Sequence, residues 1–117
     1  LRQSDKGKIV LIGSINGLPK ATDNLIGYAA SKFGVRGLAY ALRDELRKDA
    51  IGVTVINPGS VGTGVAYAEG LDTALTRYGT SRVPLADMVA VVRCAVELSA
   101  ATVMREIDLP AMDGRDV

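Results

Sequence analysis

Two short stretches of the chain, Lys8–Gly13 and Gly52–Asn57, are almost continuously apolar and rich in β-branched residues or leucine. Runs of this length without strict alternation are typical of strands that are buried on both faces of a parallel sheet. A third strand is expected over Met104–Leu109, where Pro110 ends it. We therefore predict a sheet of about three strands.

Segments with helical spacing lie between these strands. Bulky apolar residues recur along Tyr28–Lys48, and Pro84–Ala100 is predicted to form an amphipathic helix. A glycine-rich loop and then a short helix over Ala68–Tyr78 are expected between them. The order strand, helix, strand predicts a right-handed parallel crossover and hence an α/β fold. The expected apolar stripe of the last helix consists of Leu85, Met88, Val89, Val92 and Val96.

Small residues follow one side of the predicted helix Tyr28–Lys48. They allow another backbone to approach closely, either that of the sheet or that of a partner helix. The glycines each weaken a helix by about 1 kcal/mol relative to alanine, so packing must compensate. This set consists of Ala29, Ala30, Gly34, Gly37 and Ala41.

Composition narrows the class of protein. The chain has 117 residues, 48% of them apolar, and a net charge of +1. This balance favours one modest globular domain and gives no argument for binding nucleic acid or an anionic membrane surface. No apolar stretch approaches the ~20 residues of a membrane span. Cys94 is the single cysteine, which fits a reducing compartment such as the cytoplasm, and we predict no metal site.

The candidate chemistry centres on Tyr28 and Lys32. Their spacing of four places both side chains on one side of a helix. A nearby ammonium favours the phenolate and lowers a phenol pKa that is ordinarily ~10. The chain contains no histidine, so this pair is the leading candidate for acid/base catalysis. Taken alone, the same pair is more often a packed aromatic beside a solvated lysine.

Two loops strengthen the case for a site. Ser14 directly follows the first apolar run, and Pro58–Thr63 follows the second. Ligands of open parallel sheets bind outside the carboxyl ends of the strands, so both loops and the start of the Tyr28 helix converge on one crevice. Each loop alone has a simpler interpretation, as a strand-end hydroxyl that satisfies the backbone and as a plain turn.

Ser14, the block Tyr28–Val35 and the block Asn57–Thr63 together closely resemble the C-terminal half of a short-chain dehydrogenase/reductase. The resemblance extends over most of residues 7–109. It implies the second half of a Rossmann-like doubly wound parallel sheet, with residues 1–117 forming a single partial domain. The glycine-rich dinucleotide-binding beginning of that family does not occur in this sequence, so we expect the chain to be the second half of an enzyme.

The resemblance also implies roles for individual residues. Tyr28 matches the general acid/base, Lys32 the lysine that lowers its pKa and hydrogen-bonds the nicotinamide ribose, and Ser14 the serine that positions the substrate oxygen. Ser14 precedes Tyr28 by one position more than in much of the family, which implies an insertion in the loop between them. The cofactor implied is NAD or NADP. Besides Tyr28 and Lys32, the matching cofactor contacts are Pro58, Gly59, Val61 and Thr63.

The function expected for the full-length protein is therefore an NAD(P)-dependent interconversion of a small-molecule alcohol and carbonyl. A nucleotide-sugar epimerase or dehydratase shares the Tyr-x-x-x-Lys spacing and remains an alternative, as does a catalytically inert half. We expect no measurable cofactor affinity from the 117 residues alone. We also expect a homo-oligomer, and a missing segment or partner chain that covers the edge of the Lys8–Gly13 strand.

Overall fold

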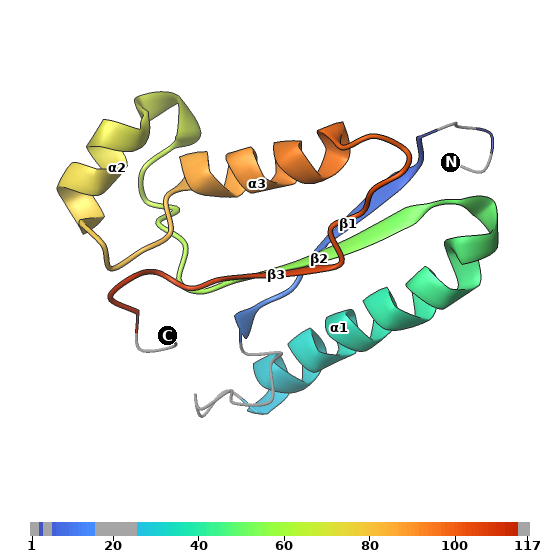
Figure 1. Ribbon diagram of the computed structural model, residues 1–117. Helices are drawn as coiled ribbons and strands as arrows, with labels where there is room; N and C mark the ends of the chain where they lie inside the picture. The colour runs from blue at the N-terminus through green and yellow to red at the C-terminus, as the bar shows by residue number, and fades with distance from the viewer. Residues whose placement is uncertain (1–2, 4–5, 16–25, 115–117) are drawn as a thin grey trace.

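The computed structural model of the chain describes residue 3, residues 6–15 and residues 26–114, with the backbone alone of Tyr28 and Ala29. Three parallel strands form one sheet in the order β1-β2-β3 (Figure 1). Strand β1 is Lys8–Ile12, β2 is Gly52–Pro58 and β3 is Glu106–Leu109. The predicted three-stranded parallel sheet is confirmed.

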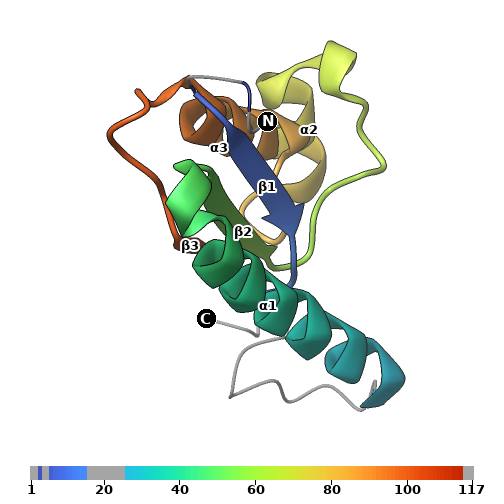
Figure 2. The same cartoon turned by 90° about the vertical axis from the view of Figure 1, so that its right-hand side faces the viewer.

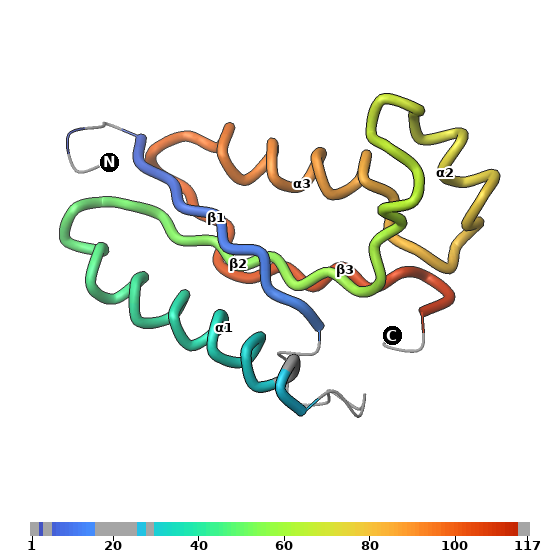
Figure 3. The backbone as a smooth tube through the Cα atoms, turned by 180° about the vertical axis from the view of Figure 1, so that it is seen from behind, coloured from blue at the N-terminus to red at the C-terminus, as the bar shows by residue number. Residues whose placement is uncertain are grey.

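Helices cover both faces of this sheet. Helix α1, Ile26–Leu46, lies against one face and α3, Leu85–Glu97, against the other, while α2, Leu71–Tyr78, lies beyond the amino end of α3 (Figures 1 and 3). Two 3-10 turns, Arg47–Asp49 and Tyr67–Glu69, follow α1 and precede α2. The fold class predicted from the sequence, a Rossmann-like parallel sheet with flanking helices, is confirmed.

The core sits between α1 and the middle of the sheet. Val53 and Val55 on the central strand are fully buried against Ala39 of α1, and Leu42 and Leu46 pack around them. Side chains alternate along a strand, so Thr54 and Ile56 face α3 instead. Because β2 has a neighbour on each side and a helix over each face, most of its residues are apolar, and its polar residues Thr54 and Asn57 are buried as well.

The two crossovers of the sheet have opposite hands. The connections β1-α1-β2 and β2-α3-β3 step in the same direction across the sheet, yet α1 and α3 lie on opposite faces (Figure 2). One crossover therefore departs from the strong right-handed preference of such units. A long connection between β2 and α3, which contains α2, gives the chain room to reach the far face.

Parts of both long helices remain open to solvent. The small side of α1 does not pack on the sheet: Gly34 and Gly37 are exposed, and a Cβ on either would meet nothing within 4 Å. Phe33 and Leu38 are exposed as well, because Leu38 lies about 100° around the helix from Ala39.

The apolar stripe predicted for α3 is only partly covered. All of its residues but Leu85 line an open groove, and Ala95 is the buried residue of the helix. The reason is that α3 lies over β1, which is an edge strand, so part of the helix extends past the sheet. None of the helices in the described part of the chain has the length and apolar character needed to cross a membrane.

Candidate active site

The carboxyl ends of the strands meet in a close-packed junction. The Gly13 N–H donates to the Ile56 carbonyl at 2.7 Å, which continues the pairing of β1 and β2 by one residue. A Cβ on Gly59 would lie 3.5 Å from Cδ1 of Ile15 and 3.2 Å from Cα of Pro110. The absence of a side chain at Gly59 therefore lets the segments that follow all three strands approach one another.

The predicted site residues of the two loops lie at this end of the sheet. Ser14, next to Gly13, is 5% exposed, and Pro58 is buried. Val61 is half-buried and Thr63 is exposed, whereas Gly62 between them is buried. The hydroxyl of Thr63 is thus accessible to a ligand at the carboxyl end of the strands.

Helix α1 contributes Lys32 to the same end of the molecule. Its amino end lies where β1 ends (Figure 1). Lys32 is half-buried and precedes the fully buried Ala39 by two helical turns, so it lies on the side of α1 that faces the sheet. The side chain of Tyr28 and the loop 16–25 lie outside the described residues. The pairing of Tyr28 with Lys32 therefore stays a prediction.

The loop after β2 is held by α2 and by the start of α3. Val83 forms a bridge with Val61, and its backbone exchanges hydrogen bonds of 2.8 Å with Ser60 and Gly62. The ring of Tyr78 packs directly on Gly62, where a Cβ would lie 2.8 Å from two ring carbons.

Helix α2 makes a second contact with this loop. Arg77 Nη1 donates to the Gly64 carbonyl at 3.0 Å, and the Tyr78 hydroxyl lies against Gly64 itself. Tyr78 clamps the loop, whereas Tyr67 is 53% exposed. This contact was not predicted; the glycines at 62 and 64, which leave room for the ring and hydroxyl of Tyr78, are its trace in the sequence.

A polar network beneath the junction was not predicted. Asn57 is fully buried, and its Nδ2 donates to Asp108 Oδ1 at 3.0 Å and to Glu106 Oε1 at 3.2 Å. Arg36 Nε donates to Glu106 Oε1 at 2.5 Å, and the Tyr40 hydroxyl donates to Oε2 at 2.9 Å. The network therefore ties the ends of β2 and β3 to the middle of α1.

This network shifts the pKa values of its members. Burial raises the pKa of Glu106, but the hydrogen bonds from Arg36, Tyr40 and Asn57 outweigh burial and hold it below its usual value. Burial and the bond to Glu106 raise the pKa of Tyr40, and the bond to Glu106 raises that of Arg36. Glu106 is thus a carboxylate and Arg36 a cation at neutral pH, so their ion pair is permanent there.

The groups at the carboxyl end suit an oxygen-bearing organic substrate. A hydroxyl from Ser14, a hydroxyl from Thr63 and the ammonium of Lys32 are neutral or cationic hydrogen-bond donors, and donors of this kind stabilise charge that develops on an oxygen. Within the described part of the chain, no three His, Cys, Asp or Glu side chains are grouped so that they could hold a metal ion.

Comparisons with known proteins agree with this arrangement. The sequence profile described as short chain dehydrogenase matches residues 1–73. Dehydrogenase/reductase SDR family member 11 of Gallus gallus is 41% identical over 69 residues, which cover 56% of this chain and 27% of that protein.

Solved structures extend the similarity over nearly the whole chain. Serine dehydrogenase from Escherichia coli superimposes with a TM-score of 0.65 at 27% identity, covering 90% of this chain and 40% of the other. A closed form of serine dehydrogenase complexed with NADP+ gives 0.66 at 29% identity, covering 90% and 44%. The chain thus spans less than half of these structures, and its matches cover 22–27% of the curated relatives. Its fold and the profile match over residues 1–73 show that the chain belongs to the short-chain dehydrogenase/reductase family.

Proposed function

We propose that this chain is the catalytic half of an NAD(P)-dependent oxidoreductase that interconverts an alcohol and a carbonyl group. The observation that carries the proposal is the position of Lys32, half-buried on the sheet-facing side of α1 and at the same end of the sheet as Ser14 and Thr63. One helical turn before it, Tyr28 is placed by the backbone of α1 at the start of the same helix.

In this proposal the residues divide the work of proton transfer. Tyr28 gives a proton to the carbonyl oxygen of the substrate, or takes one from the alcohol. The Lys32 ammonium favours the phenolate and so brings the pKa of Tyr28 toward neutral pH. Ser14 donates a hydrogen bond that orients the substrate oxygen and stabilises the charge developing there.

The loop after β2 fits the nicotinamide end of a dinucleotide. Gly59 lets three segments pack closely, and beyond it lie the half-buried Val61 and the exposed Thr63. A bound nicotinamide would supply the hydride, and the protein orients the reactants and moves the proton. We propose that a segment outside these residues binds the rest of the dinucleotide. We also propose that the protein acts in the cytoplasm.

The uncovered surfaces support a larger assembly. The edge of β1 that faces away from β2 has no strand beside it among the described residues, and Ile12 on this strand is exposed. We propose that a further segment or a partner chain covers this edge. We also propose that the open side of α1, with Gly34, Gly37 and Leu38, packs against its counterpart in a second subunit.

The test is Tyr28→Phe in the full-length protein, with Tyr67→Phe as the matched control. Turnover of a panel of small ketones and alcohols with NADH, NADPH and their oxidised forms should fall by at least about 10²-fold for Tyr28→Phe. The affinity for the cofactor should change little, and Tyr67→Phe, which alters an exposed ring outside the strand ends, should behave as wild type.

Retained turnover in Tyr28→Phe would overturn the acid/base assignment. Sugar nucleotides belong in the same panel, because activity with them and not with simple carbonyls would favour an epimerase or dehydratase over the proposed reductase.

A further inference from the structure

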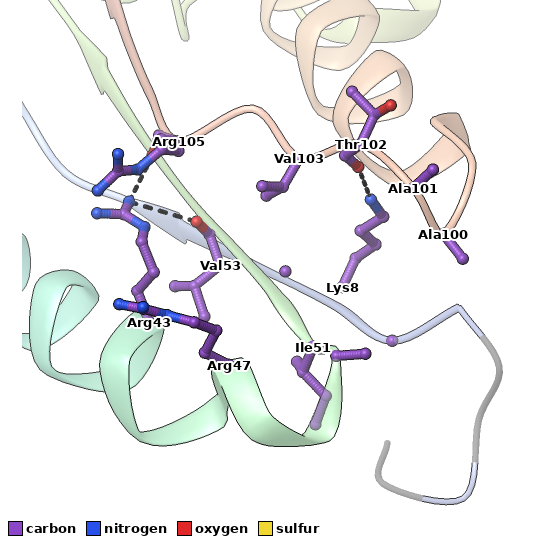
Figure 4. A pocket seen from close by; sticks show the side chains of 13 residues that line it. Lys8, Arg43, Arg47, Ile51, Val53, Ala100, Ala101, Thr102, Val103 and Arg105 are labelled. Carbon is purple, nitrogen blue, oxygen red and sulfur yellow. Dashed lines mark hydrogen bonds between the residues drawn. The ribbon is translucent and has the colours of Figure 1, made fainter.

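A cavity lies at the amino-terminal end of the sheet, opposite the candidate active site (Figure 4). It has a volume of about 450 Å³ and is bounded by the start of β1, the end of α1, the start of β2 and the connection from α3 to β3. The candidate active site lies at the carboxyl ends of the same strands. This cavity is therefore a separate feature of the molecule.

Its charged lining is of one sign. Lys8, Arg43, Arg47 and Arg105 contribute to the wall, and no aspartate or glutamate does so among the described residues. Asp44, outside the wall, forms an ion pair with Arg47 at 2.8 Å, but both side chains are mostly exposed and the pair is weakly held. A cleft lined by one sign of charge concentrates ions of the opposite sign.

The donors of this wall are only partly used. Arg43 Nη2 donates to the carbonyls of Arg105 at 2.9 Å and Val53 at 3.4 Å, while the Nε of Arg43 is buried without a hydrogen-bond partner. The guanidinium of Arg105 makes no hydrogen bond or ion pair with the part of the chain that the structure describes. Figure 4 shows the Arg43, Arg47 and Arg105 side chains gathered on one side of the cavity.

The opposite side of the cavity is different in character. There Lys8 Nζ donates to the carbonyls of Thr102 and Ser99, so its hydrogen bonds are largely made. Between the two sides lie the apolar side chains of Ile51 and Val103 (Figure 4). The cavity thus combines a cluster of guanidinium groups with an apolar floor.

We propose that this cavity binds a small organic phosphate. Guanidinium groups match the geometry of phosphate oxygens and form strong, charge-assisted hydrogen bonds with them. The phosphate would lie at the guanidinium groups of Arg43, Arg47 and Arg105, which share one side of the cavity. A volume of about 450 Å³ exceeds the needs of a lone phosphate and is within the range of small-molecule sites, so the organic part lies against Ile51 and Val103.

The test is a titration with phenyl phosphate at low salt, followed by two-dimensional ¹⁵N NMR that includes the arginine Nε–H signals. We expect saturable one-to-one binding, with shifts at the Arg43 Nε–H and in the backbone of residues 50–53 and 100–105. Inorganic phosphate should bind more weakly, and phenol should not bind, because each lacks one half of the ligand. Added salt should weaken the binding.

Arg105→Gln is the decisive variant, because the Arg105 side chain is exposed and makes no bond whose loss would disturb the fold. This variant should weaken the binding of phenyl phosphate at least about tenfold, since one charge-assisted pair is removed. Arg93→Gln, which removes an exposed arginine of α3 outside the cavity, is the matched control and should bind as wild type.

Three results would overturn the proposal: no saturable shift, shifts spread over the whole surface, or equal weakening by Arg93→Gln. If inorganic phosphate bound as tightly as phenyl phosphate, the proposal that the ligand carries an organic group would be refuted as well.

Discussion

Gly13→Ala tests how tightly the carboxyl end of the sheet is packed. A Cβ at Gly13 would lie closer than 3.0 Å to Asn57 Oδ1 and 3.3 Å from Cγ2 of Val55. Neither neighbour is free to move, because Val55 and Asn57 are fully buried and Asn57 is held by its bonds to Glu106 and Asp108. An added methyl group must therefore shift β1 or break these bonds.

The size of the effect follows from three contributions. Overpacking a buried site costs about 1–3 kcal/mol. Losing one hydrogen bond to a charged carboxylate costs about 1.5–3 kcal/mol. Alanine in place of glycine reduces the freedom of the unfolded chain and returns about 0.4–1 kcal/mol. We expect a net loss near 2 kcal/mol, since a partial shift of β1 relieves some of the overpacking and keeps some of the hydrogen bonding.

The free energy of unfolding should be measured by urea titration with far-UV circular dichroism, because the chain has no tryptophan for fluorescence. The midpoint of thermal unfolding should fall by roughly 6–12 °C. Gly34→Ala, measured at a dilution where the chain is monomeric, is the matched control: a Cβ there meets nothing within 4 Å in an exposed part of α1, so it should stabilise by about 0.5–1 kcal/mol.

A double-mutant cycle identifies the cause. In an Asn57→Ser background the penalty for Gly13→Ala should shrink, because the clashing amide oxygen is absent. If Gly13→Ala were neutral or stabilising, as Gly34→Ala is expected to be, the described packing of β1 on Asn57 would be wrong.

Two further substitutions probe the polar network and the loop clamp. Glu106→Gln should lower stability by about 1–2 kcal/mol at neutral pH, through loss of the ion pair with Arg36. Because the folded pKa of Glu106 is depressed, its contribution is complete above its unfolded value of ~4.3 and is lost as the pH falls through the folded value, so wild type and variant should converge in acid urea titrations. Gly62→Ala should displace the Tyr78 ring and speed amide hydrogen exchange over residues 71–78, with little change in global stability. Gly37→Ala is the control, because a Cβ there meets nothing within 4 Å. Unchanged exchange in Gly62→Ala would contradict the contact between Tyr78 and the loop.

The strands and helices could be predicted because their patterns are local. Buried parallel strands leave continuous apolar runs, and β2 has the predicted position within one residue. Strand β3 begins at Glu106 and not at Met104, because its pairing starts where Glu106 lies opposite Val55. Helix α1 ends at Leu46, where the chain tightens into a 3-10 turn before Ala50 adopts a left-handed conformation. Such ends depend on hydrogen bonds that the apolar pattern does not contain.

The site was predictable only where residues are placed by their own strand or helix. Ser14 comes just after β1, Pro58 is the last residue of β2 and Lys32 follows the helical period, so their common end of the sheet could be inferred. The Asn57 network could not, because it joins residues 49–70 positions apart. Its trace in the sequence is weak: Glu106 and Asp108 share one face of a strand.

Helix α1 connects the two proposed sites and also keeps them apart. Lys32 lies near its amino end and Arg43 near its carboxyl end, and eleven residues of helix separate them by about 16 Å. That distance exceeds the Debye length of about 8–10 Å near physiological ionic strength, so charge at one end is screened from the other. A phosphate at Arg43 should therefore leave the pH dependence of Tyr28 catalysis unchanged. If a phosphate bound at Arg43 did affect turnover, it would have to act by moving α1 against β2, where Ala39 is packed on Val53 and Val55.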